Sequence, residues 1–500
     1  MTRIRRLNIT GAALAVMMNL SCGYAQTNAE SEGLSLTIPE AVLMALEQNR
    51  AMAVARLSPQ IQRTFEQTQR ASFDPILSGG ISQENSEQQS LNQSDSAVTT
   101  SETQNVTGSV ALDQQLPTGT HITLGGSTEI DKASNTDVEL AGTRAGLTVS
   151  QSLLKGFGTG ANLADLRQAR LDTAISEFEF SAFAMTLVAQ VEKSCWDYEL
   201  ARAQVDIVHE SMRLAEQQLG ETLERIRIGK LAAVERAAAE AEVAFRREAM
   251  INAESNLTTA RLRILRLLNA PTSNLWNRAV DIRVPRDQQA PTPDDPEDHV
   301  QVALRLRPDL NQARLALQRD ELEVVKTRNG LLPKLDFFIT LGQTGYADSF
   351  SESLGSDDAS DVTVGLLAQY PLGARSDRAA HRRAELSREQ AGYAVENLSQ
   401  VVQVDVRTAY VEMRRFEEQV AATRATQKLQ EEKLRAETEK FRIGKSTSLL
   451  VAQAQRDYAQ SQINEAQAVA NSFKTSIDLY RLDGSLLERR GLNVPGERRE

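Results

Sequence analysis

Two glycine-rich stretches have residue types that could hold a phosphate group. The run Gly156-Phe157-Gly158-Thr159-Gly160-Ala161 follows a strand pattern and opens a helical one, as a dinucleotide-binding turn does. The helical pattern continues to Ile228, however, and no parallel strand returns to complete a βαβ unit. The run Gly444-Lys445-Ser446 has the form of the end of a phosphate-binding loop, but Glu439 stands where that loop needs its first glycine. Neither stretch therefore predicts a nucleotide site.

Other residue types that could do chemistry are too few or too scattered. The four histidines have no metal-ligand spacing, and no nucleophile-turn sequence of the Gly-x-Ser-x-Gly type occurs. The two cysteines, Cys22 and Cys195, cannot build a disulfide framework, and Cys195 suits a small apolar position on a helix. We therefore expect no enzyme, no metal and no cofactor. The histidines are His121, His209, His299 and His381.

Composition narrows the class of partner. The chain has 500 residues, a formal net charge of -11 and a pI near 5.2. No basic patch is visible that could neutralise phosphates, so nucleic acid is not expected as a partner. Charged residues make up 25% of the chain and aromatic residues only 5%, which suits long exposed helices better than one thick core.

One stretch occurs twice and organises the elements around it. Arg227-Ile228-Gly229-Lys230 recurs as Arg442-Ile443-Gly444-Lys445, and the same spacing separates Val191 from Val406 upstream. A heptad-like apolar seam precedes each copy, as in helices that pack side by side. Each seam ends at a glycine that can adopt the left-handed conformation. The sequence therefore predicts two helical hairpins with Gly229 and Gly444 in their turns.

The remaining patterns fall into two copies of one order. Each copy has a half-length helix, then strands, a long helix and a second half-length helix. The half-length helices together match the long one, so we expect them to stack end to end beside it. The first copy is longer, which one extra β-hairpin would explain. The expected helices are 36–70, 162–228, 232–268, 297–330, 376–443 and 448–480. The expected strands are 76–83, 107–116, 121–130, 145–154, 334–346 and 362–370.

The strands alternate in polarity and differ in their connections. Polar stretches at 84–106 and 131–144 contrast with the tight turn Pro117-Thr118-Gly119. Long polar loops on one side and a short turn on the other are typical of outer-membrane strands. The alternative is a soluble β-hairpin domain.

The N-terminus has the form of a secretory leader. Arg3, Arg5 and Arg6 precede a short apolar run, so residues 1–25 are expected to be a signal peptide. An alternative is a lipoprotein signal, in which Cys22 would be acylated. The domain order that follows is a first repeat at 36–270, a proline-rich linker at 271–296, a second repeat at 297–482 and a polar tail at 483–500.

These features resemble the TolC family of outer-membrane efflux channels over nearly the whole mature chain. The first repeat opens with Leu36-Thr37-Ile38-Pro39-Glu40-Ala41-Val42, and the second carries Arg307-Pro308-Asp309-Leu310. Gln151-Ser152-Leu153-Leu154 leads into Gly156-Phe157-Gly158 like the family's strand-to-helix passage, and Pro371-Leu372-Gly373 resembles its second-repeat counterpart. Their order and duplication, more than any single motif, carry the resemblance.

The resemblance implies a mainly α chain with a membrane β-barrel portion, built from two repeats with long coiled-coil hairpins. It implies a homotrimer whose strands form one β-barrel in the outer membrane. The helices of the three copies would form one α-barrel that extends into the periplasm. It also implies a passive duct that serves a periplasmic adaptor and an inner-membrane pump. The adaptor-contact tips would be Ile228, Gly229, Lys230, Ile443, Gly444 and Lys445.

Two departures from the family stand out. Members often have paired aspartates past the second tip that form an acidic ring, whereas this chain has Leu450 and Gln453. The matching first-repeat position is Glu235, a possible entrance ring that would favour cations. The extra hairpin gives six strands instead of the usual four.

Two readings of function differ in class. The first is an outer-membrane channel of a tripartite efflux or type I secretion system, exporting small molecules or proteins. The alternative is a periplasmic coiled-coil scaffold or adaptor without a pore. Adaptors usually have one helical hairpin, whereas this chain has two, which favours the channel.

Overall fold

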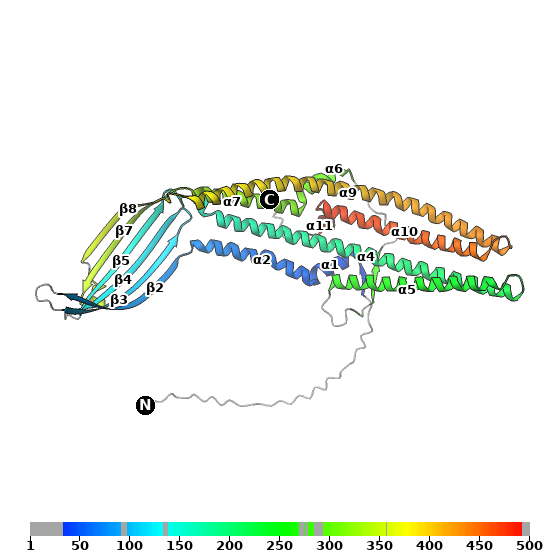
Figure 1. Ribbon diagram of the computed structural model, residues 1–500, viewed down its shortest axis with the longest axis horizontal. Coiled ribbons are helices and arrows are strands. Elements are labelled where there is room, and N and C mark those ends of the chain that lie inside the picture. The colour runs from blue at the N-terminus through cyan, green and yellow to red at the C-terminus, as the bar shows by residue number, and fades with distance from the viewer. Residues whose placement is uncertain are drawn as a thin grey trace, which may run out of the picture.

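The computed structural model describes residues 34–91, 98–133, 139–269, 276, 279–284, 294–356 and 358–492. The expected leader, with Cys22, lies outside these residues. The molecule is elongated, with a β-sheet at one end and two helical hairpins at the other (Figure 1).

The elements follow the two-copy order. The first copy consists of β1 (Leu34–Thr37), α1 (Ile38–Gln48), α2 (Arg50–Arg70), β2 (Ile76–Leu91), β3 (Val98–Gln115), β4 (Thr120–Ala133), β5 (Glu139–Ser152), α3 (Thr159–Asn162), α4 (Ala164–Arg227) and α5 (Val234–Leu268). The second consists of β6 (Val280–Arg283), α6 (Pro296–Leu306), α7 (Pro308–Gly330), β7 (Lys334–Ala347), α8 (Phe350–Ser353), β8 (Ala359–Gln369), α9 (Arg375–Arg442), α10 (Ser448–Leu482) and α11 (Leu486–Arg489).

The two long helices are the rods of the molecule. Helix α4 has 64 residues and α9 has 68, which correspond to about 96 and 102 Å at 1.5 Å per residue. Helices α2 and α5 lie beside opposite halves of α4, and α7 and α10 lie beside opposite halves of α9 (Figure 1). The expected end-to-end stacking of the half-length helices is confirmed.

In each copy the half-length helix that leads into the strands is interrupted, which the sequence did not predict. The expected helix at 36–70 begins only at Ile38, after β1, and breaks at Asn49, whose backbone is extended (φ -66°, ψ 121°). The Asn49 side chain accepts hydrogen bonds from the backbone N–H groups of Ala51 (2.8 Å) and Met52 (3.2 Å), so it caps α2. The expected helix at 297–330 breaks at Arg307, because a residue before proline is driven out of the helical region.

The sheet has six antiparallel strands in the order β2-β3-β4-β5-β7-β8. The extra hairpin of the first copy is therefore confirmed. The strands extend well into the polar stretches that we expected to be loops, since β2 and β3 are paired from Ile76↔Asp113 to Leu91↔Val98. Ladder hydrogen bonds join backbone groups, so polar side chains do not end a strand.

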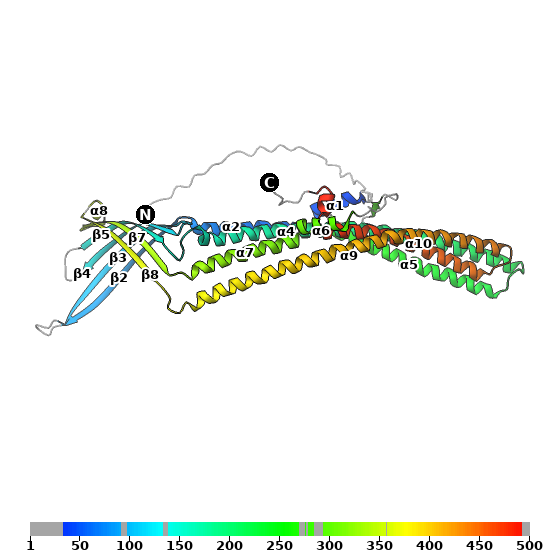
Figure 2. The same cartoon turned by 90° about the horizontal axis from the view of Figure 1, so that it is seen from above.

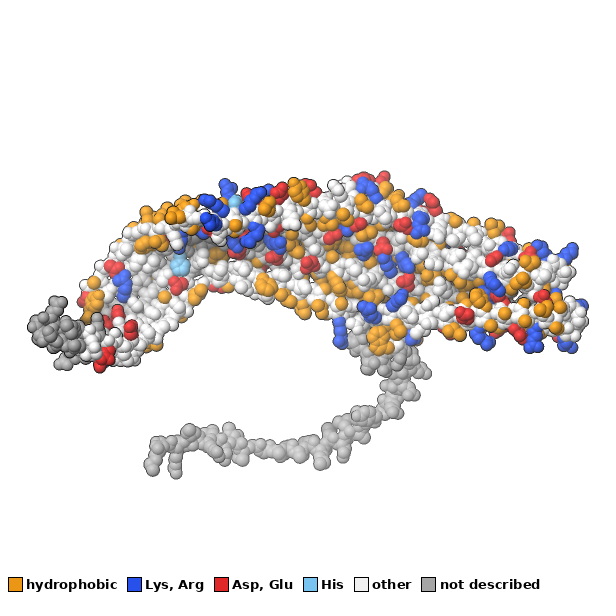
Figure 3. Space-filling model, viewed as in Figure 1, with side chains coloured by type: hydrophobic (Ala, Val, Ile, Leu, Met, Phe, Trp, Pro, Cys, Tyr) orange, Lys and Arg blue, Asp and Glu red, His pale blue; other side chains and the backbone are white. Residues whose placement is uncertain are grey.

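The two faces of the sheet differ in chemistry. On β7 and β8, one face carries the pairs Ile339↔Val364 and Leu341↔Val362. The other face carries Gly342↔Asp361. There Arg144 of β5 reaches across Gly342 to form two 2.7 Å hydrogen bonds to Asp361. A Cβ on Gly342 would lie 2.3 Å from Nη2 of Arg144, so a larger residue there would displace this ion pair. Figure 3 shows charged side chains on the hollowed face of the sheet.

The core lies at mid-length, where α1, β6 and α11 contact α4. Strand β1 pairs in parallel with β6, and Val191 and Cys195 of α4 are buried there. Figure 2 shows α1 and α11 together at this level, on one side of the long helices. Leu486 of α11 is fully buried, so the start of the expected polar tail packs into the core. Among the described helices, none is both long and apolar enough to cross a membrane.

Candidate functional site

The first hairpin tip is built by a left-handed glycine. Helix α4 ends at Arg227, and Gly229 follows with φ 72°. The N–H of Gly229 donates to the carbonyl of Ile226 (2.9 Å), and that of Lys230 donates to the carbonyl of Arg225 (2.8 Å). These two bonds satisfy carbonyls that the helix end would leave without partners. They also leave Ile228 half exposed at the end of the molecule.

The second tip repeats this geometry. Gly444 has φ 78°, and the Lys445 N–H donates to the Lys440 carbonyl at 2.8 Å. Ile443 is exposed, as Ile228 is in the first tip. Each tip also carries an Arg–Glu ion pair at the same place, Arg227–Glu224 in the first and Arg442–Glu439 in the second. The sequence repeat is thus a repeat of one local structure.

The two tips touch each other. Arg225 donates from Nη1 to the carbonyl of Phe441 (3.2 Å), and its guanidinium lies 4.4 Å from the centre of the Phe441 ring. Glu235, the proposed entrance-ring residue, accepts a hydrogen bond from the hydroxyl of Ser448 at the start of α10. Its carboxylate is therefore part of the junction between the hairpins. Leu450, one of the two departures from the acidic pattern, is 46% exposed.

A charged cluster joins the hairpins farther from the tips. Glu242 of α5 is buried and accepts from Arg246 Nε (2.9 Å) on its own helix and from Arg456 Nε (2.9 Å) on α10. Burial lowers the pKa of Arg246, although the Glu242 carboxylate opposes that shift. The hydrogen bond to Glu242 raises the pKa of the more exposed Arg456. The two directions differ because Arg246 loses more of its hydration.

The sequence identified the tips but not the residues that join them. The contacts of Arg225 with Phe441 and of Glu242 with Arg456 cross between the two repeats. The Glu242–Arg246 spacing of four residues was visible as a helical pair, but nothing in the sequence indicated the second arginine.

The histidines do not form a site together. His299 is buried and its Nδ1 lies 2.8 Å from Asp483 Oδ2, whereas His121 lies 3.5 Å from Asp113 on the sheet. Within the described ranges, no group of three or more histidine, cysteine, aspartate or glutamate side chains could hold a metal ion. Cys195 is buried, and burial raises the pKa of its thiol to about 12.

Comparisons with known proteins agree with an architecture of two repeats. The family model described as outer membrane efflux protein matches residues 121–270 and 299–485. No curated protein sequence matches the chain. Solved structures with similar folds include the outer-membrane channel OprN, with 18% identity, a TM-score of 0.67 and coverage of 89% of each chain.

Two further structures give the same result. The Campylobacter jejuni CmeC outer membrane channel has 14% identity and a TM-score of 0.68, over 96% of this chain and 94% of that one. The open state of the Neisseria gonorrhoeae MtrE outer membrane channel has 18% identity and a TM-score of 0.62, over 90% and 89%. At such identities the likeness shows the fold, and the family model shows the family. Channels of this family are trimeric, non-enzymatic efflux components. The chain therefore belongs to the outer membrane efflux protein family, as an outer-membrane efflux channel that extends into the periplasm.

Proposed function

We propose that three copies of this chain close into one passive duct, which receives cargo from an inner-membrane pump through a periplasmic adaptor. The observation that carries this proposal is that, among the described residues, both lateral edges of the six-stranded sheet lack a partner. In the sheet, β2 and β8 each pair on one side only. An open edge exposes backbone N–H and C=O groups, which lipid cannot satisfy. Pairing β2 of one copy with β8 of the next removes both open edges of the six-stranded sheet.

The helical edges support the same closure. A stripe of exposed apolar side chains runs along α2 at three- and four-residue steps, and a sparser one runs along α9 at steps of eleven and seven residues. Contiguous exposed apolar surface, as on α2, marks an interaction site. The stripe on α2 comprises Val54, Leu57, Ile61 and Phe65, and the stripe on α9 comprises Tyr393, Val404 and Val411, all of them more than half exposed.

The hairpin tips are the proposed adaptor contact. Ile228 and Ile443 expose apolar surface at the end of the molecule, beside the exposed Lys230 and Lys445. An apolar centre with a charged rim is the usual anatomy of a protein interface. The glycines Gly229 and Gly444 hold this surface in shape. The same duct could carry small molecules or, in type I secretion, proteins.

The test of the assembly uses a charge placed in the α2 stripe. We expect Ile61→Asp to convert the detergent-purified trimer into monomer, measured by light scattering during size-exclusion chromatography. Gln67→Asp, which adds the same charge on another side of α2, should remain trimeric. A wild-type chain that is monomeric, or that osmotic shock releases from cells, would instead support the periplasmic scaffold.

The test of the tips uses Ile228→Asp together with Ile443→Asp. The double variant should remain trimeric and membrane-inserted but lose export and co-purification with an adaptor. Full export by this variant would contradict the tip assignment.

A further inference from the structure

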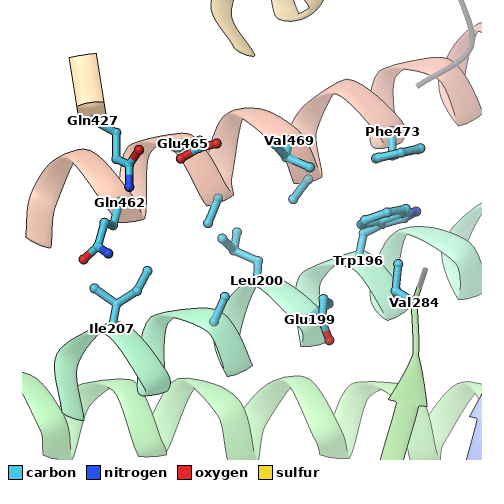
Figure 4. Close-up of a pocket in the computed structure, with 13 residues that line it drawn as sticks. Trp196, Glu199, Leu200, Ile207, Val284, Gln427, Gln462, Glu465, Val469 and Phe473 are labelled. Carbon is cyan, nitrogen blue, oxygen red and sulfur yellow. The ribbon is translucent and has the colours of Figure 1, made fainter. Parts of the chain in front are cut away.

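A cavity of about 330 Å³ lies between α4 and α10, just beyond the mid-length core. On each helix the lining residues recur at three- and four-residue intervals, so each wall is one face of a helix. Figure 4 shows Leu200 and Ile207 of α4 pointing toward α10, and Val469 and Phe473 of α10 pointing toward α4. The space is open because small side chains line both walls. These are Ala203 on α4 and Ala466 and Ala470 on α10.

One end of the cavity is closed by a pair of aromatic rings. Trp196 and Phe473 stack with their centroids 3.9 Å apart and their planes 8° from parallel. Both side chains are more than nine-tenths buried. The stacked pair gives the cavity a rigid aromatic wall, against which another ring can pack edge to face.

The polar part of the lining is acidic. Glu199 and Glu465 line the cavity with Gln427 and Gln462, and no lysine, arginine or histidine is among the lining residues in the described part of the chain. Oε1 of Glu465 accepts from Arg424 Nε at 3.2 Å. The Arg424 side chain is 58% exposed, so this ion pair is weak. A half-buried carboxylate beside an apolar wall favours a ligand that brings one positive charge with its apolar surface.

We propose that this cavity binds a small aromatic monocation, with the ring against Trp196 and Phe473 and the positive charge toward Glu465. Its volume is at the lower end of the about 300–1,000 Å³ range of small-molecule sites. The lining residues other than the aromatic pair are mostly only half-buried, so a ligand can enter from solvent. The position that matches Trp196 in the second repeat is Val411, so the aromatic wall occurs once per chain. The inference does not depend on the assembly proposed above.

The test follows the fluorescence of Trp196 in the full-length protein. The chain has two tryptophans, and Trp276→Phe leaves Trp196 as the only reporter. The probe is 1-methylquinolinium, a flat aromatic cation that quenches tryptophan fluorescence. We expect saturable quenching in the parent protein. We expect affinity to fall by about threefold or more in Glu465→Gln, as for the loss of one partly exposed charge pair.

Two further variants separate binding from general effects. Asp457→Asn removes a charge from α10 outside the cavity and should leave affinity unchanged. Ala466→Phe fills the cavity and should abolish saturable quenching, and Ala203→Leu fills it from α4 if the first variant does not fold. Quenching that is not saturable, or that survives a folded cavity-filling variant, would overturn the site. An unchanged affinity in Glu465→Gln would overturn the assigned cation.

Discussion

The clearest quantitative prediction concerns Glu242, which joins the two hairpins. Glu242→Ala leaves Arg246 buried without its partner, and Nη2 of Arg246 already has no hydrogen-bond acceptor within the described part of the chain. Breaking a buried ion pair costs about 3–5 kcal/mol. The Arg456 side chain is 48% exposed and regains water once released. The expected cost is therefore near the lower limit, about 3 kcal/mol.

The cost should appear as local opening of α5 against α10. A loss of about 3 kcal/mol raises the opening equilibrium about a hundredfold, since about 1.4 kcal/mol corresponds to tenfold. Hydrogen exchange of the α5 and α10 amides, followed by mass spectrometry, measures this change. The control is Glu240→Ala on the same helix, which breaks the exposed ion pair with Arg236. It should cost less than about 1 kcal/mol. If Glu242→Ala speeds exchange no more than Glu240→Ala, the cluster does not hold the hairpins together.

Four other predictions follow from the described residues. Gly229→Val or Gly444→Val should reduce export and leave the trimer, because a β-branched residue at positive φ costs at least about 1–2 kcal/mol. Nothing lies within 4 Å of an added Cβ at either glycine, so only the backbone is strained, and normal export in both variants would contradict the tip assignment. Glu235→Gln should lower the cation preference in planar bilayers, and an unchanged reversal potential would exclude the proposed ring. Cys195 should resist thiol reagents at pH 8 until the protein unfolds, because burial raises its pKa to about 12. The Thr37 backbone N–H lowers the pKa of Glu40 below its ordinary 4.5, so its support of the α1 N-terminus should be full above about pH 4.5 and be lost below it, as amide exchange in α1 would show.

The parts of the fold that sequence predicted well are those set by local rules. The long helices were placed within two residues of their ends, because the apolar seam has one period and the tip glycines stop it. The start of α1 also follows a local rule, because the Thr37 N–H donates to the Glu40 carboxylate three residues later at 2.8 Å. The six strands followed from the greater length of the first copy, which one extra β-hairpin explains.

The parts that sequence did not predict depend on residues far apart in the chain. The β1–β6 pair has four residues in each strand, too few to show a periodic pattern. The helical periodicity of apolar residues continues across the break at Asn49 and across the break at Arg307. Each segment was therefore predicted as one helix. The partners of Arg225 and Glu242 lie in the other repeat, so no local spacing reveals them. The cavity beside Trp196 exists because alanines on two different helices face each other, which requires the packed structure.

The mid-length position of β1 bears on how the chain could be anchored. Helices α1 and α2 have 11 and 21 residues, so together they rise about 48 Å from Ile38 toward the strands. The twelve residues from Cys22 to Leu34 reach at most about 43 Å when fully extended. The two lengths are nearly equal, so a fatty acid on Cys22 could enter the lipid that surrounds the sheet only if the intervening residues ran almost fully extended beside α1 and α2.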